Sequence, residues 1–269
     1  MDIGTSKPSK DITNKLPHHF INMIDPDQNY SAGQFANEAH RVIENILDQE
    51  KTPLVVGGSG LYLRALLNGF FSQNVRDEEI RKQLHTRLEN EGAAKLYEEL
   101  GKVDPVSAKK IHPNNTKRVI RALEVHSVSG KPLSELQKGK KDPALFPYIK
   151  FGIIMEREKL YKKTNYRVER MFEKGLVQEV EQIISMGYSK NLNSLNSVGY
   201  KEAIEYLEGK TDLETCIEQV KQNTRRYAKR QLTWFRAEKD VHWVSIDPSN
   251  DYISGAAEYI LNQFNKFDF

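Results

Sequence analysis

Apolar residues recur at intervals of three and four along much of this chain, a pattern that predicts helices with one buried face. After an irregular stretch of about thirty residues, the first such helix has apolar positions at Phe35, Ala39, Val42, Ile43, Ile46 and Leu47. The β-branched run TPLVVGG at residues 52–58 predicts a strand, and residues 62–69 predict a helix ended by Gly69. This succession of helix, strand, turn and helix is typical of an α/β sheet.

The middle of the chain has no strand pattern. From about residue 74 to residue 137 the apolar spacing is helical, and Gly130 stands where a helix would end. A strand pattern returns at YIKFGIIME, followed by predicted helices at 157–173, 176–186 and 213–236, one more strand and a final helix. We therefore predict an α/β core in two parts, residues 1–73 and 148–269, separated by a helical insertion domain at residues 74–147.

Composition narrows the class of protein. Of the 269 residues, 38% are hydrophobic and 29% charged, and no apolar run approaches the roughly 18 residues that span a membrane, so we expect a globular protein with no membrane partner. The first residues lack the apolar core of a signal peptide. The single cysteine, Cys216, excludes an internal disulfide and fits a reducing cytoplasm. Its position on an amphipathic helix predicts a packed side chain.

Basic residues gather in one predicted helix, although the net charge of the chain is only +3. Residues 221–236 contain six basic residues and no acidic one. Most of them form two adjoining stripes, with Lys221, Arg225 and Lys229 in one and Arg226 and Arg230 in the other. Arginine forks suit phosphate oxygens, so these stripes favour a nucleic-acid or phosphate site over a solvated face. Val220 and Tyr227 are expected to pack on the core.

A glycine-rich turn lies between the predicted strand and the helix that follows it. Gly57, Gly58 and Gly60 surround Ser59, and such glycines let backbone amides come close to a ligand at a helix N-terminus. The segment has neither the Lys-Ser/Thr pair of a Walker A loop nor the spacing of a dinucleotide fingerprint. Taken alone, the segment favours a tight turn, and a ligand-binding turn is the alternative.

A second basic helix follows His112. Val119 and Ile120 are expected to face inward, while Lys117, Arg118 and Arg121 lie on the opposite side at spacings of three and four. A solvated basic face is an equal alternative to a binding face here. His112 is expected to help start the helix, with Asn114 or Asn115 as its cap. No cluster of His, Cys or carboxylate residues has metal-ligand spacing.

Seven motifs occur together along the chain. They are MDIGTSKP, DPDQNYSAGQF, GGSGLYLRAL, DPVSAKKIHPNNTKRVIRALEV, REKLYKKTNYRVERM, NSVGYKEA and TRRYAKRQLTW. In this order and spacing, from Met1 to about Trp243, they resemble the bacterial tRNA dimethylallyltransferase family. The resemblance implies a P-loop-type, nucleotide-binding α/β core with a parallel sheet and a helical insertion domain, which hold a tRNA anticodon stem-loop between them. It implies transfer of a dimethylallyl group from dimethylallyl diphosphate to N6 of adenosine 37, Mg²⁺ at the leaving diphosphate, and a cytoplasmic monomer.

The resemblance also assigns roles to particular residues. Ser59 matches a hydroxyl that contacts the target adenosine, and Arg167 matches an arginine tied to catalysis. The residues matched to tRNA contact are Ser59, Arg81, Lys117, Arg118, Val119, Ile120, Arg121, Asn196, Ser197, Val198, Gly199, Tyr200, Lys201, Thr224, Arg225, Arg226, Tyr227, Ala228, Lys229, Arg230 and Gln231.

One part of the family pattern has no match in this sequence. Family members carry a first strand, a phosphate-binding P-loop and a general-base aspartate before the position that Met1 matches. We therefore expect this segment, which also supplies the hydroxyl that binds Mg²⁺, to be missing. The chain as written is then expected to hold no metal ligand and to be inactive without that segment.

Two other functions remain open. An adenylate dimethylallyltransferase shares the core, but a free nucleotide needs neither a helical insertion nor two basic helices. A catalytically inactive tRNA-binding protein would follow from loss of the P-loop. Comparing a stem-loop RNA with AMP as the acceptor discriminates the first alternative. The DNA sequence upstream of Met1 discriminates the second.

Overall fold

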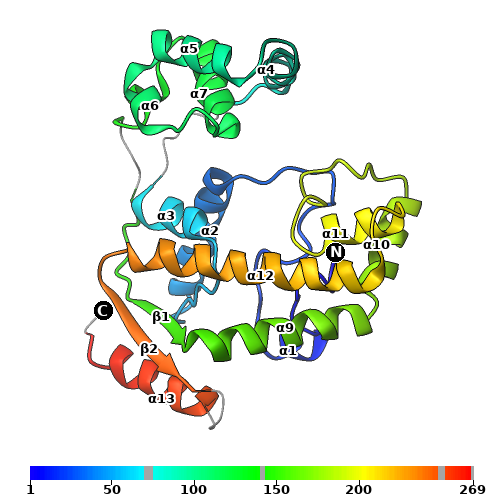
Figure 1. The fold of residues 1–269 in the computed structure, drawn as a ribbon. Helices are drawn as coiled ribbons and strands as arrows, with labels where there is room; N and C mark the ends of the chain where they lie inside the picture. The colour runs from blue at the N-terminus through cyan, green and yellow to red at the C-terminus, as the bar shows by residue number, and fades with distance from the viewer. Residues whose placement is uncertain (70–74, 140–142, 248–251, 268–269) are drawn as a thin grey trace. The chain divides into compact units, whose positions relative to one another are not determined.

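The computed structural model describes residues 1–69, 75–139, 143–247 and 252–267 (Figure 1). The chain divides into two compact units. The first contains Met1–Tyr30, Leu54–Gly60 and Phe146–Phe269, and the second contains Ser31–Pro53 and Leu61–Leu145. The division predicted from the sequence, with boundaries at residues 73 and 147, stays a prediction.

A two-stranded parallel sheet lies in the first unit. Strand β1 (Lys150–Met155) pairs with β2 (Val241–Ile246), with Lys150 opposite Val241 and Met155 opposite Ile246. Parallel strands need a long crossover, and here it is helical. Its helices are α9 (Arg157–Glu173), α10 (Leu176–Ser185), α11 (Tyr200–Leu207) and α12 (Leu213–Arg236). The long helix α12 packs along α9, and α13 (Tyr252–Phe264) packs on β2 (Figure 1).

The strand predicted at residues 52–58 is wrong. These residues form neither helix nor strand, and the side chains of Leu54 and Val56 are 77% and 83% exposed. A β-branched run becomes a strand only where a neighbouring strand completes its hydrogen bonds. Among the described residues the sheet holds β1 and β2 alone.

The helices of the first unit follow their apolar spacing. The bounds predicted for α9 and α12 are confirmed, as are both strands in this half of the chain. Two short helices were not predicted, α1 (Lys10–Lys15) and α11. The core between α9, α10 and α11 contains Met171, Leu176, Val180, Ile183, Leu195, Tyr200, Ala203 and Ile204.

The second unit is helical among its described residues, as the apolar spacing predicts. Its helices are α2 (Ala32–Leu47), α3 (Gly60–Asn68, whose first residue belongs to the first unit), α4 (Glu78–Glu91), α5 (Ala93–Val103), α6 (Pro105–Lys110), α7 (Thr116–Ser129) and α8 (Leu133–Leu136). Side chains cap several of them; Asp77 accepts from the amides of Glu79 and Ile80 at the start of α4. Gly130 ends α7 in the left-handed conformation at φ 69°, as predicted.

The main core of the second unit joins α4 through α8. It contains Val75, Leu84, Leu96, Leu100, Ala108, Val119, Ile120, Ala122, Leu123, Val125 and Leu133. A smaller cluster of Ala32, Ala36 and Ala65 joins α2 to α3. None of the described helices in either unit is both long enough and apolar enough to cross a membrane.

Candidate functional site

The glycine turn is held against the C-terminal end of α12. Gln231 Nε2 donates a hydrogen bond of 2.9 Å to the carbonyl oxygen of Gly58. A Cβ atom at Gly58 would lie 2.0 Å from Gln231 Nε2, and one at Gly60 would lie 2.0 Å from Trp234 Nε1. Glycine at these two positions therefore lets α12 approach the turn. Ser59, between them, is exposed.

This contact joins two segments that the sequence analysis selected separately. Ser59 lies beside the end of the basic run that includes Gln231, so the structure brings these predicted site residues together. It also supports the tight turn that the segment alone favours, because the glycines let the turn pack against α12. A packed turn and an exposed hydroxyl are compatible, since packing fixes the backbone on either side of Ser59.

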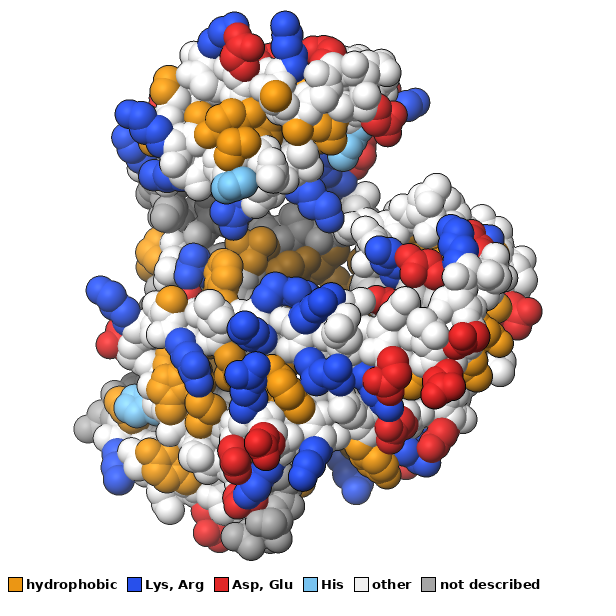
Figure 2. Space-filling view, in the orientation of Figure 1, with side chains coloured by type: hydrophobic (Ala, Val, Ile, Leu, Met, Phe, Trp, Pro, Cys, Tyr) orange, Lys and Arg blue, Asp and Glu red, His pale blue; other side chains and the backbone are white. Residues whose placement is uncertain are grey.

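Helix α12 has one buried stripe and one basic surface. Cys216, Val220 and Thr224, spaced four apart, are buried, which confirms the packed cysteine. The prediction for Tyr227 is wrong: the residue is 45% exposed, and its ring lies under the guanidinium of Arg230, 5.7 Å from the ring centroid. The reason is that the stripe continues at spacing four, which excludes position 227. Lys and Arg side chains gather over α12 and α9 in Figure 2.

The two stripes of α12 have different surroundings. Lys221 bonds Glu169 on α9 and Glu218 on its own helix, both at 2.8 Å, and these bonds raise its pKa. Arg225 Nη1 donates a 2.7 Å bond to Asn165 Oδ1, also on α9. Beyond these contacts the exposed cations of α12 are Arg226, Lys229, Arg230 and Arg236. The exposed cations of this helix therefore lie in its C-terminal half, and their role in binding stays a prediction.

Arg167 lies apart from that surface. Asn165 and Glu169 of α9, one turn apart, make polar contacts with α12. Arg167 lies midway between them in sequence, which places it on the opposite side of the helix. Its side chain is exposed and has no hydrogen bond or ion pair with another described residue. The structure therefore does not bring Arg167 together with the basic run of α12, and its catalytic role stays a prediction.

Residues 196–201 mainly help to pack the start of α11 against α12. Gly199 has φ 98°, which favours glycine, and its amide donates a 2.7 Å bond to Glu202 Oε2. The other oxygen of the buried Glu202 accepts a 2.7 Å bond from Asn223 Nδ2 on α12. Asn196, Ser197 and Lys201 are exposed, Val198 is half-buried and Gly199 is buried.

Tyr200 is a core residue whose hydroxyl meets the half-buried carboxylate of Glu179. Its hydroxyl donates a 2.7 Å bond to Glu179 Oε2, and Glu179 also accepts the amides of Asp2, Ile3 and Gly4. Burial, and then Glu179, raise the pKa of Tyr200. Burial acts to raise the pKa of Glu179 too, but the amide and hydroxyl donors outweigh it and lower that pKa. The side chain of Tyr200 therefore cannot present itself to a ligand at the surface.

The second basic helix, α7, contains both core and surface residues of its predicted binding run. Val119 and Ile120 are buried in the hydrophobic core of the second unit, so their side chains pack α7 against its neighbours and do not face a ligand. Lys117 and Arg118 are exposed. Arg121 and Arg81 are half-buried, and both bond the carboxylate of Glu124, which the sequence analysis did not select.

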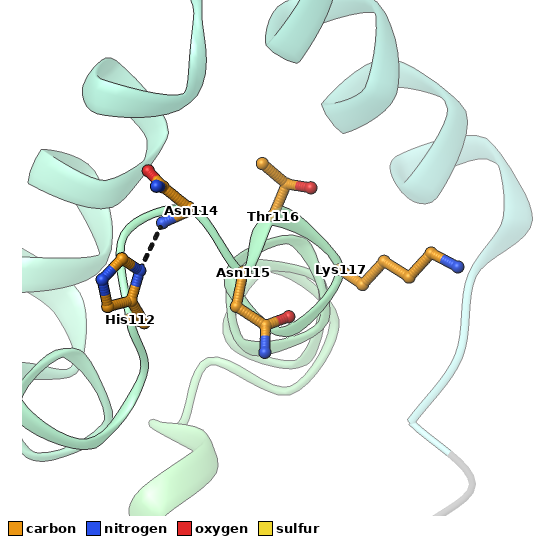
Figure 3. A pocket seen from close by; sticks show the side chains of 5 residues that line it. All are labelled: His112, Asn114, Asn115, Thr116 and Lys117. Atoms are coloured by element: carbon orange, nitrogen blue, oxygen red, sulfur yellow. Dashed lines mark hydrogen bonds between the residues drawn. The ribbon is translucent and has the colours of Figure 1, made fainter. Parts of the chain in front are cut away.

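An open hollow of about 460 Å³ lies at the start of α7 (Figure 3). It is lined by His112, Asn114, Asn115, Thr116 and Lys117. Asn115 Oδ1 accepts from the amide of Arg118 at 3.3 Å, which confirms Asn115 as the cap. His112 Nδ1 accepts from the amide of Asn114 at 3.2 Å, so the ring helps shape the turn, as predicted.

The residues that the structure describes do not provide a cluster of side chains that would bind magnesium. Across these residues, no three or more His, Cys, Asp or Glu side chains come together as they would to hold a metal. Carboxylate oxygens are the usual protein ligands of Mg²⁺. We therefore derive no step through Mg²⁺, and its use stays a prediction.

Comparisons with known proteins agree over nearly the whole chain. The model of the IPP transferase family matches residues 1–238. A tRNA dimethylallyltransferase of Geobacter sulfurreducens is 45% identical over 259 residues, covering 96% of this chain and 83% of that protein. One from Thermotoga neapolitana is 46% identical over 248 residues, covering 91% and 80%.

Solved structures show the same fold. The full-length tRNA isopentenylpyrophosphate transferase of Bacillus halodurans is similar at a TM-score of 0.66 and 36% identity, covering 99% of this chain and 84% of that one. A eukaryotic dimethylallyltransferase acting on tRNA gives a TM-score of 0.78 at 31% identity, covering 98% and 70%. The α/β fold of this chain, with a small parallel sheet and many helices, is thus similar to the folds of these proteins.

Proposed function

The chain belongs to the IPP transferase family, and we propose that it transfers a dimethylallyl group from dimethylallyl diphosphate to N6 of adenosine 37 in tRNA. The observation that carries this proposal is the bond between Gln231 and Gly58, because it places the exposed Ser59 beside the basic end of α12. A hydroxyl that can meet a base and a surface that can meet phosphates are then next to each other.

The reaction defines what the site must supply. The N6 amine of adenine attacks C1 of the dimethylallyl group, the bond from C1 to the diphosphate oxygen breaks, and one proton leaves the amine. Ser59 would hold the adenine by a hydrogen bond, while the arginines of α12 would face the negative charge of RNA or diphosphate. The need for a P-loop segment and a general base stays a prediction, so the transfer assays use the chain joined to such a segment, with residues 1–269 alone, expected to be inactive, as the comparison.

Two exposed basic surfaces support an RNA acceptor rather than a free nucleotide. One is the C-terminal half of α12, and the other is the start of α7, with Lys117 and Arg118. A polyanion that contacts several cations releases counterions, so its binding weakens steeply as salt rises. We propose that the protein is a monomer that binds one anticodon stem-loop.

An acceptor comparison tests the proposal. With labelled dimethylallyl diphosphate, the protein should modify an anticodon stem-loop with a far higher kcat/KM than AMP. Comparable use of AMP would move the protein to the adenylate-modifying class. Tight, salt-dependent binding of the stem-loop without any transfer would indicate a tRNA-binding protein that is not an enzyme.

A further inference from the structure

A fully buried carboxylate lies beneath one of the basic surfaces. Glu124 on α7 has a side-chain exposure of 0%, although the same helix carries residues predicted to meet a polyanion. A buried charge is tolerated only where partners compensate for lost hydration. A negative charge near an RNA surface also works against binding, so its presence there requires an explanation.

The partners of Glu124 are two arginines and one amide. Arg81 Nη2 on α4 and Arg121 Nη1 on α7 both donate to Glu124 Oε2, each at 2.9 Å. Because the two nitrogens bond the same oxygen, the two guanidinium groups lie side by side. The amide of Asp77 donates to Oε1 at 3.3 Å, and Arg121 Nη1 also donates to the carbonyl of Val75 at 2.7 Å. The carboxylate therefore connects α4, α7 and the segment that leads into α4.

Both arginines keep donors available for a ligand. Their side chains are 32% and 31% exposed, and a guanidinium has five N–H donors, more than these contacts use. Lys117 and Arg118 lie one turn before Arg121 on the same face of α7, and both are exposed. Two fixed guanidinium groups thus extend an exposed basic surface across α4 and α7.

We propose that Glu124 is a positioning residue for tRNA binding. Its carboxylate holds the guanidinium groups of Arg81 and Arg121 side by side, so that their outer N–H groups bind the oxygens of one phosphate in the tRNA backbone. Holding both side chains before binding removes the entropy cost of ordering them on the RNA. This inference rests on the proposed function, because it takes tRNA as the ligand.

Substitution of Glu124 by glutamine separates positioning from simple electrostatics by the sign of the effect. Glutamine keeps the shape but removes a negative charge, so electrostatics alone predicts tighter binding of an anticodon stem-loop. Positioning predicts the opposite: Kd rises about 5-fold to 10-fold, and the slope of log K against log salt falls by about one as a phosphate contact is lost. Glu98→Gln is the control, since Glu98 is an exposed residue of α5 that pairs with Lys102.

A second variant keeps the proposal testable if Glu124→Gln fails to fold. Arg81→Lys preserves the charge but not the planar fork, so the proposal predicts weaker binding and a shallower salt slope. Wild-type affinity for Arg81→Lys, or equal or tighter binding by a folded Glu124→Gln, would overturn the inference. If the wild-type protein itself fails to bind the stem-loop, the proposed function fails instead.

Discussion

A single methyl group at Gly60 tests whether α12 positions the turn that carries Ser59. In Gly60→Ala the new Cβ would lie 2.0 Å from Trp234 Nε1, 2.2 Å from Cδ1 and 2.5 Å from Cε2. Ordinary contacts between carbon atoms are about 3.5–4.0 Å, so the indole ring or the turn must move by more than about 1 Å. The substitution therefore forces apart two elements that the wild-type structure holds together.

The expected cost follows from that overlap. Inserting a methyl group into a packed site costs about 1–3 kcal/mol. Alanine is a better helix former than glycine by at most about 1 kcal/mol, and Gly60 begins α3, so this gain does not cancel the overlap. A shift of about 1 Å next to a reacting group can cost up to about 100-fold in rate. We expect kcat/KM for stem-loop modification to fall between about 10-fold and 100-fold.

The same turn supplies the control. A Cβ at Gly57 would meet nothing within 4 Å, so Gly57→Ala should change stability by less than about 0.5 kcal/mol and leave turnover near that of the wild type. Thermal unfolding and steady-state transfer kinetics measure both variants. Adding Trp234→Leu to Gly60→Ala should recover part of the lost activity, because the overlap is relieved. Equal activity of Gly57→Ala and Gly60→Ala would refute the positioning role of α12.

Three further outcomes are expected. The amide and hydroxyl donors of Glu179 lower its pKa from the ordinary value of 4.5, so the carboxylate stabilises the fold above that pH and this stabilisation is lost as the pH falls through the folded pKa. Melting curves of Glu179→Gln should therefore lack this loss of stability in acid. A pH dependence of melting equal to that of the wild type would contradict the role of Glu179. Lysine at position 225 cannot keep both the bond to Asn165 and a two-pronged phosphate contact. The Kd of Arg225→Lys for the stem-loop should therefore rise several-fold in a filter-binding assay, and an unchanged Kd would show that Arg225 does not bind the RNA. Arg167→Ala should raise the transfer barrier by about 2–4 kcal/mol with little change in stem-loop Kd; normal turnover with weakened RNA affinity would instead assign Arg167 to RNA binding.

Strong periodicity made much of the fold predictable from the sequence. Helices α9 and α12 each span several turns with a continuous buried stripe, so their ends could be read directly. The error at residues 52–58 has a physical cause, since strand formation depends on a neighbour that the local sequence does not specify. Helix α11 was missed because it has only 8 residues and begins after Gly199, where the backbone has positive φ.

The candidate site was predictable only in part. The basic run in α12 and the glycine turn around Ser59 could be selected from local patterns, whereas charge spacing on α7 left a solvated face equally open. Glu124, Glu179 and Glu202 could not, because each lies on an otherwise ordinary amphipathic helix, where a carboxylate normally indicates the solvated face. The full burial of Glu124 and Glu202 and the partial burial of Glu179 depend on partners far along the chain, such as Gly4 for Glu179 and Asn223 for Glu202.

The most direct measurement is the identity and position of the modified nucleoside. An anticodon stem-loop with adenosine at position 37 is incubated with the protein and dimethylallyl diphosphate, then analysed by mass spectrometry as nucleosides and as fragments of known position. We predict N6-dimethylallyladenosine at position 37, and no product when position 37 is guanosine. Product at another adenosine, or an equal yield from the guanosine variant, would contradict the proposed function.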